Sequence, residues 1–69
     1  MVKYKIPAVD GAITDEEIAK TIAEKTVYTE KDEEGNEVKK TIVKDWVVHT
    51  NYVIIETEKE IKELEKFKI

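Results

Sequence analysis

The chain has no cysteine in its 69 residues, and this absence limits what it can fold into. Without cysteine there is no disulfide framework and no thiolate metal site. A domain of this size buries a modest fraction of its surface, so its stability must come from packing, local propensity or association with another chain. There is room for one hydrophobic core, and we expect residues 1–69 to form a single domain.

Strict alternation of polar and apolar residues predicts the first strand. Val2, Tyr4 and Ile6 point one way and the intervening lysines the other, which is typical of a half-buried strand at 2–6. Proline cannot donate a hydrogen bond to a sheet, so Pro7 is expected to end this strand.

A longer alternating region predicts a β-hairpin that continues into further strands. Residues 26–32 and 37–44 flank a polar loop with Gly35 and Asn36, which favour turn conformations. The second of these strands is expected to run on to His49, with a bulge at Asp45. A tight turn and a last strand complete a three-stranded meander, and they are expected at Thr50–Asn51 and Tyr52–Glu56.

Two capping boxes, each a Thr followed three residues later by a Glu, predict two helices. The first box is Thr14 with Glu17 and opens a helix at about 15–25. The second is Thr57 with Glu60. Apolar residues of this second helix are expected to face the sheet or to finish the core: Ile61, Leu64, Phe67 and Ile69.

These elements give an α+β fold with the order β-α-β-β-β-α, a mostly antiparallel sheet of three to four strands and two helices. The element order of residues 14–67 resembles that of the double-stranded-RNA-binding domain. The Gly-Pro-x-His loop of that family is replaced by the acidic segment 32–36, and the lysine cluster of its second helix by 57–60. Because phosphate binding needs cations, we carry over no functional residue.

The charge and hydropathy of the chain restrict its partners. It has 12 basic and 16 acidic residues, a net charge of −4, with both signs interspersed. A basic strip of Lys3, Lys5, Lys39 and Lys40 is the one feature that would suit a weak nucleic-acid-binding module. The apolar runs are far shorter than the ~20 residues of a transmembrane helix, and the first residues do not resemble a signal peptide. We expect a soluble protein with no membrane partner, cytoplasmic if it is natural.

No constellation of residues suggests catalysis, a cofactor or a metal. His49 is the only histidine, serine is absent, and the two glycines are isolated. The acidic residues at 15–17 suit the N-terminus of a helix, whose dipole favours anions. We therefore expect no enzyme activity, and His49 is expected to bond to backbone or water at the end of a strand.

The segments 46–48 and 52–55 are apolar on both strand faces. A sheet covered on one side would expose either Val47, Val53 and Ile55 or Trp46, Val48 and Ile54. The strands are either buried on both faces or form an interface with another chain. The candidate interface residues are Trp46, Val48, Tyr52 and Ile54.

The composition bears on origin, because Ser, Arg and Gln are absent together with Cys. Thermophilic chains disfavour Cys and Gln, but this tendency does not explain the missing Ser and Arg. Computed sequences fill exposed positions with strong structure formers such as Glu, Lys, Thr and Val. The leading hypothesis is a designed or idealised structural or scaffold protein. The alternative is a small natural homodimeric interaction protein, binding or inhibiting a partner, from a thermophile, virus or phage.

Overall fold

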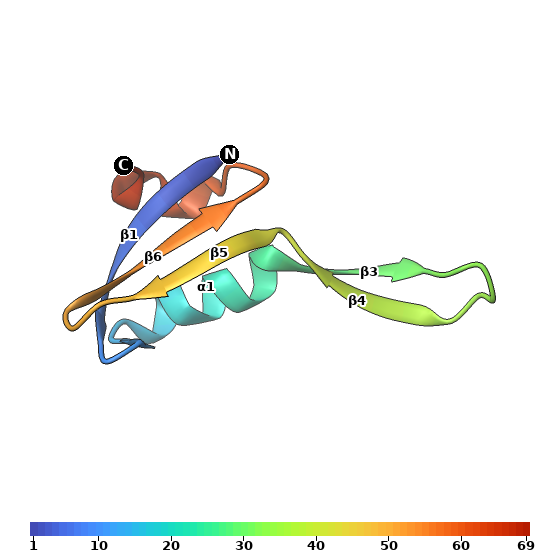
Figure 1. Ribbon diagram of the computed structural model, residues 1–69, viewed down its shortest axis with the longest axis horizontal. Coiled ribbons are helices and arrows are strands. Elements are labelled where there is room, and N and C mark those ends of the chain that lie inside the picture. Colours follow the sequence, from blue (N-terminus) through green and yellow to red (C-terminus); the bar gives the residue numbers. More distant parts are fainter.

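The computed structural model describes residues 1–69 and has an α+β architecture (Figure 1). In chain order its elements are β1 (Val2–Val9), β2 (Ala12–Ile13), α1 (Glu16–Thr26), β3 (Val27–Lys31), β4 (Glu37–Thr41), β5 (Val43–Val48), β6 (Tyr52–Thr57) and the 3-10 helix η1 (Lys62–Phe67). Neither helix is long and apolar enough to cross a membrane.

The main sheet has four strands in the order β2-β1-β6-β5, and all neighbours are antiparallel. Its two inner strands come from opposite parts of the chain, with Tyr4 opposite Ile55 and Ile6 opposite Val53. Residues directly opposite each other share a face of the sheet. All four side chains are fully buried and form the centre of the core.

Both helices pack on this inner face of the main sheet. Ile22 of α1 and Leu64 of η1 belong to the same buried cluster as Tyr4 and Ile55. The Tyr4 hydroxyl accepts a hydrogen bond from the Ile61 backbone N–H at 2.7 Å, which fixes the start of η1 beside β1. The outer face of the sheet is left open to solvent.

The first strand is longer than the sequence predicts, because it continues through Pro7 to Val9. Ala8 donates its backbone N–H to Asn51 beside β6, whereas the Pro7 carbonyl accepts from Thr14 on the other side. Backbone groups alternate in direction along a strand, so the nitrogen of Pro7 points away from β6. The missing N–H therefore costs no hydrogen bond between β1 and β6, and the expectation that Pro7 ends the strand is wrong.

Helix α1 forms where it is predicted but begins differently. Asp15, not Thr14, is the N-cap, and its carboxylate accepts from the backbone N–H groups of Glu17 and Ile18. Both Thr and Asp are good N-caps, and adjacent candidates cannot be ranked from sequence spacing. The face of α1 that is turned to the core contains Ile22, which is buried, and Ile18, which is half-buried.

The second helix is a 3-10 helix that starts at Lys62, and the predicted capping box at Thr57 does not form. The Thr57 hydroxyl is buried at the end of β6 and donates to the Lys59 carbonyl at 2.6 Å. The spacing of Ile61, Leu64 and Phe67 matches the three-residue turn of a 3-10 helix, so they share one face. Ile69 is 67% exposed, so the expectation that it finishes the core is wrong.

The predicted hairpin is confirmed, but it forms a separate two-stranded sheet of β3 and β4 rather than part of a meander. This hairpin arm projects from the body, and every residue of its strands is exposed (Figure 1). The buried Ile42 interrupts the long alternating run. Its N–H donates to Thr26 and its carbonyl accepts from Glu58, each at 2.9 Å, so it ties the base of the arm to the body.

The predicted turn between the last two strands is confirmed. His49 donates its N–H to the Tyr52 carbonyl at 2.9 Å across Thr50–Asn51. The predicted bulge is displaced by one residue, because Val43 lies opposite Thr57 and Asp45 opposite Glu56. Lys44 is thus the extra residue in β5.

Candidate functional site

The two edges of the main sheet differ in whether they are covered. Beyond β1, the edge is covered by β2 and by the C-terminal residues, where Ile69 donates to the Lys3 carbonyl and Lys68 bridges to Tyr4. Beyond β5, no further strand follows (Figure 1). This open edge of β5 is the candidate functional site, because an unpaired strand edge offers backbone groups to another chain.

The direction of the backbone groups in β5 follows from its turn. His49 is hydrogen-bonded to Tyr52, and hydrogen-bonded pairs recur at every second position of an antiparallel ladder. The backbone groups of Val47 and Asp45 therefore point toward β6. Those of Trp46 and Val48 point outward, to the open side.

One of these outward groups is bonded within the chain. The carboxylate of Asp45 accepts the backbone N–H of Trp46 at 2.9 Å. Asp45 thus satisfies a donor that would otherwise be directed at solvent. The Trp46 carbonyl and both backbone groups of Val48 remain for an incoming strand.

Three consecutive apolar side chains lie along this edge. Trp46, Val47 and Val48 are 42%, 41% and 52% exposed. Trp46 and Val48 lie on the inner face, opposite Ile55 and Val53, but the edge position leaves them partly uncovered. Exposed apolar side chains beside unpaired backbone groups are the combination that favours strand addition.

The structure separates the four residues predicted to form an interface. Trp46 and Val48 lie on the inner face, whereas Tyr52 and Ile54 lie on the outer face and are half-buried. The predicted grouping of Ile54 with Trp46 and Val48 is wrong, because the tight turn places Ile54 opposite Val47. Trp46 and Val48 are accessible because β5 is the edge strand, whereas Tyr52 and Ile54 belong to the inner strand β6. The sequence pattern does not show which strand lies at the edge.

The outer face near the turn carries a stack of side chains. His49 stacks on Tyr52 with ring centroids 4.5 Å apart, and the Lys5 ammonium lies 4.4 Å from the Tyr52 ring centroid. His49 also borders a surface hollow of about 450 Å³ with Asp10, Val48 and Thr50. No group of three or more acidic or histidine side chains is placed to hold a metal ion.

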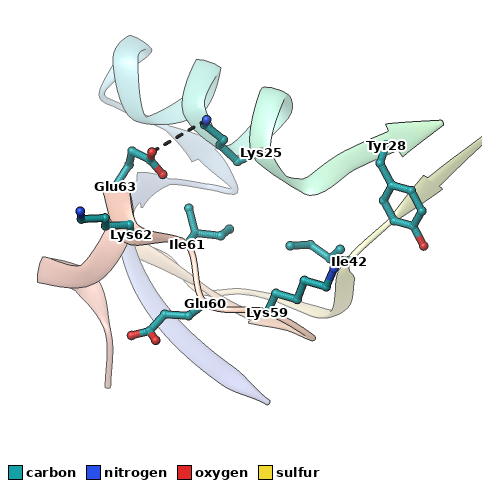
Figure 2. A pocket seen from close by; sticks show the side chains of 8 residues that line it. All are labelled: Lys25, Tyr28, Ile42, Lys59, Glu60, Ile61, Lys62 and Glu63. Carbon is teal, nitrogen blue, oxygen red and sulfur yellow. Dashed lines mark ion pairs between the residues drawn. The ribbon is translucent and has the colours of Figure 1, made fainter.

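A second hollow, of about 390 Å³, lies between the end of α1, the base of the arm and the segment before η1 (Figure 2). Its lining combines Tyr28, Ile42 and Ile61 with lysines and glutamates. Lys25 and Glu63 form an ion pair of 3.9 Å across it. The lining carries three lysines and two glutamates, and it contains no histidine.

The bulge in β5 is held by an ion pair between Lys44 and Glu58. A side-chain hydrogen bond to Glu58, reinforced by the charge of that carboxylate, raises the pKa of Lys44. The same kind of contact with Glu60 raises the pKa of Lys68. Lys44 is therefore engaged at one end of the edge, which leaves the stretch from Trp46 to Val48 apolar and uncharged.

The four lysines that suggested a basic strip do not form one. Lys3 pairs with Glu56 at 3.8 Å, and Lys5 lies over Tyr52, both on the main sheet. Lys39 and Lys40 lie on the arm and, as consecutive strand residues, point to opposite faces.

Comparisons of this chain with protein-family models, with curated proteins and with solved structures found no match.

Proposed function

We propose that the protein is a non-catalytic binding module that accepts a β-strand along the open edge of β5. The observation that carries the proposal is the coincidence of three exposed apolar side chains with outward-facing backbone groups on one unpaired edge. In strand addition, backbone hydrogen bonds supply affinity and alternate side chains supply specificity.

The way the edge is protected supports this proposal. Proteins commonly blunt an edge strand with charged side chains, above all lysine, or with a bulge. In β5 these devices, Lys44 at the bulge and Asp45, are confined to the first half of the strand. The second half, from Trp46 to Val48, has none of them, as expected of a surface meant to bind.

A strand-forming peptide of alternating Thr and Val, flanked by lysines, tests the proposal. At low protein concentration it is expected to slow hydrogen exchange of the Val48 amide and to change Trp46 fluorescence. The same peptide N-methylated at alternate amides lacks the donors and is expected to do neither.

A matched pair of variants locates the binding surface. Val47→Lys is expected to weaken peptide binding by tenfold or more, because it places a charge in the middle of the edge. Val27→Lys, at a comparably exposed apolar position on the arm, should leave binding unchanged (45% against 41% exposed). An unprotected Val48 amide, or equal effects of the two substitutions, would contradict the proposal.

The composition supports a second proposal, a designed or idealised scaffold whose only task is to adopt this structure. Its support is the joint absence of Ser, Arg, Gln and Cys. The two predicted capping boxes do not add to this support, since Asp15 caps α1 and no side chain caps η1. A scaffold of this kind is expected to stay monomeric and to ignore the strand peptide, and a natural gene that encodes the chain would contradict it.

A further inference from the structure

We infer that the strand accepted by the open edge is β5 of a second copy of this chain, antiparallel, about a twofold axis through Val47. The inference rests on the proposed function and names its partner. It follows from the direction of the backbone groups, from the faces of the sheet and from the side chains that the pairing brings together.

The faces of the sheet restrict the register of such a pair. Two antiparallel copies of one strand are related by a twofold axis perpendicular to the sheet, and this operation keeps each face on its own side. Only residues of the same face can then be opposite each other. Since faces alternate along a strand, one residue must lie opposite its own copy, and the axis passes between these two copies. Within the regular part of β5 the choices are Trp46, Val47 and Val48.

The backbone groups select Val47 among the three. Trp46 and Val48 direct their groups outward, and an axis at Val47 places Trp46 of each copy opposite Val48 of the other. Opposite residues of a hydrogen-bonded pair exchange both bonds, so this register forms four hydrogen bonds. An axis at Trp46 would put Lys44 opposite Val48, and an axis at Val48 would put Trp46 opposite Thr50, outside the strand.

The register at Val47 also gives favourable side-chain pairs. On the inner face the Trp46 ring lies beside Val48 of the second copy, an aromatic and β-branched pair of the kind that stabilises sheets. On the outer face the two Val47 side chains meet. The two main sheets, each of four strands, join into one continuous sheet with both α1 helices on the same side.

The side chains at the ends of the pairing favour a second copy over an unrelated strand, because a carboxylate that accepts hydrogen bonds meets an imidazole N–H that donates one. Asp45 lies two residues before the axis and His49 two residues after it, so each carboxylate is opposite an imidazole of the other copy. The Asp45 carboxylate now bonds the Trp46 N–H. On pairing, that N–H donates to the Val48 carbonyl of the second copy, and the carboxylate is released toward His49.

Absolute mass, measured by light scattering from low to high micromolar concentration, tests the inference on the intact chain. The wild-type protein is expected to approach twice the monomer mass. Val47→Lys should remain monomeric and Val27→Lys should dimerise like the wild type. His49→Ala is expected to weaken dimerisation about tenfold through the loss of two Asp45–His49 side-chain pairs, one at each end.

Single cysteines test the register, because the chain contains no other cysteine. The two Val47 residues form a pair without hydrogen bonds, whose ~4.5 Å Cα separation lies within the range for a disulfide. Val47→Cys is therefore expected to oxidise to a covalent dimer, whereas Trp46→Cys and Val27→Cys should not. Circular dichroism confirms that each variant is folded.

The outcomes separate this inference from the proposed function. If the protein stays monomeric at every concentration but its Val48 amide is protected by the strand peptide, the inference of a second copy is wrong and the proposed binding module stands. A dimer that crosslinks through Trp46→Cys and not through Val47→Cys overturns the register. A monomer that also ignores the peptide overturns both.

Discussion

At the scale of single residues, the β1–β2 turn and the open edge are connected through one glycine. Asp10 and Gly11 both have positive φ, 50° and 87°, and the turn they form reaches the far end of β5. A Cβ added to Gly11 would lie 3.3 Å from Cγ1 of Val48. Gly11 is thus required both by the backbone conformation and by its close approach to the candidate binding strand.

Gly11→Ala is expected to lower the free energy of unfolding by more than Gly35→Ala. Each substitution places a Cβ on a backbone with positive φ, at a cost of about 1–2 kcal/mol. Gly35 has no atom within 4 Å of an added Cβ, whereas at Gly11 the added atom also displaces Val48. Urea unfolding measures both values, and Gly11→Ala should also weaken binding of the strand peptide.

The double variant Gly11→Ala/Val48→Ala is the control for this prediction. Removing the Val48 methyl groups should bring the cost of the Gly11 substitution down to that of Gly35→Ala. If the two glycine substitutions cost the same in the wild-type background, the contact with Val48 has no energetic role.

Tyr4→Phe is expected to lower the free energy of unfolding by about 1–3 kcal/mol, because it leaves the buried N–H of Ile61 without its acceptor. Tyr4 is fully buried, and its ring would remain in place. Tyr28→Phe removes a hydroxyl from a 41% exposed ring on the arm and should have little effect. Equal unfolding midpoints for the two variants would contradict a structural role of the Tyr4 hydroxyl.

At the scale of elements, the structure set by local sequence signals was predicted better than the structure set by long-range contacts. The arm was predicted well because its alternation and its Asp32–Asn36 loop are local: Asp32 accepts from the N–H groups of Glu34 and Asn36 within the loop itself. The break at Ile42 could not be predicted, since it depends on hydrogen bonds to Thr26 and Glu58. The register that places Val47 opposite Ile54 depends likewise on the geometry of a turn, which cannot be derived from the alternation of polar and apolar residues.

The arm is expected to be dispensable for the stability of the body. Thr26 and Ile42 are joined by a hydrogen bond of 2.9 Å, so a short Gly-Asn linker can replace residues 27–41. The exposed arm has no buried side chain in either strand. The shortened protein should keep a cooperative unfolding transition by circular dichroism, and its Val48 amide should still respond to the strand peptide.

Loss of the cooperative transition in the shortened protein would show that the arm contributes to the core. The buried Thr26 and Ile42 are retained in this variant, so the loss could not be attributed to them. The full-length protein with Val27→Lys is the reference, because it keeps the arm and changes one of its side chains.

At the scale of the whole molecule, the candidate edge follows from the topology. β5 is an outer strand because the two inner positions are taken by β1 and β6, and the remaining outer side is covered by β2 and the C-terminal residues. The sequence predicted the α+β class and the antiparallel strands. It did not predict that one of the most apolar strands would lie at the edge, because strand order depends on which segments pair over long sequence distances.

The pairing of β1 with β6 also affects how the chain folds as it is made. The end of β1 pairs early with β2, but residues 2–7 find their partners only in β6. This part of the first strand therefore emerges from the ribosome with no strand to bond until β6 has been synthesised. Contacts between distant segments slow folding, because a long loop must close first. The arm, whose strands are close in sequence, can form earlier. The body is therefore expected to fold only after most of the chain has left the ribosome, and until then Tyr4 and Ile6 are within reach of chaperones.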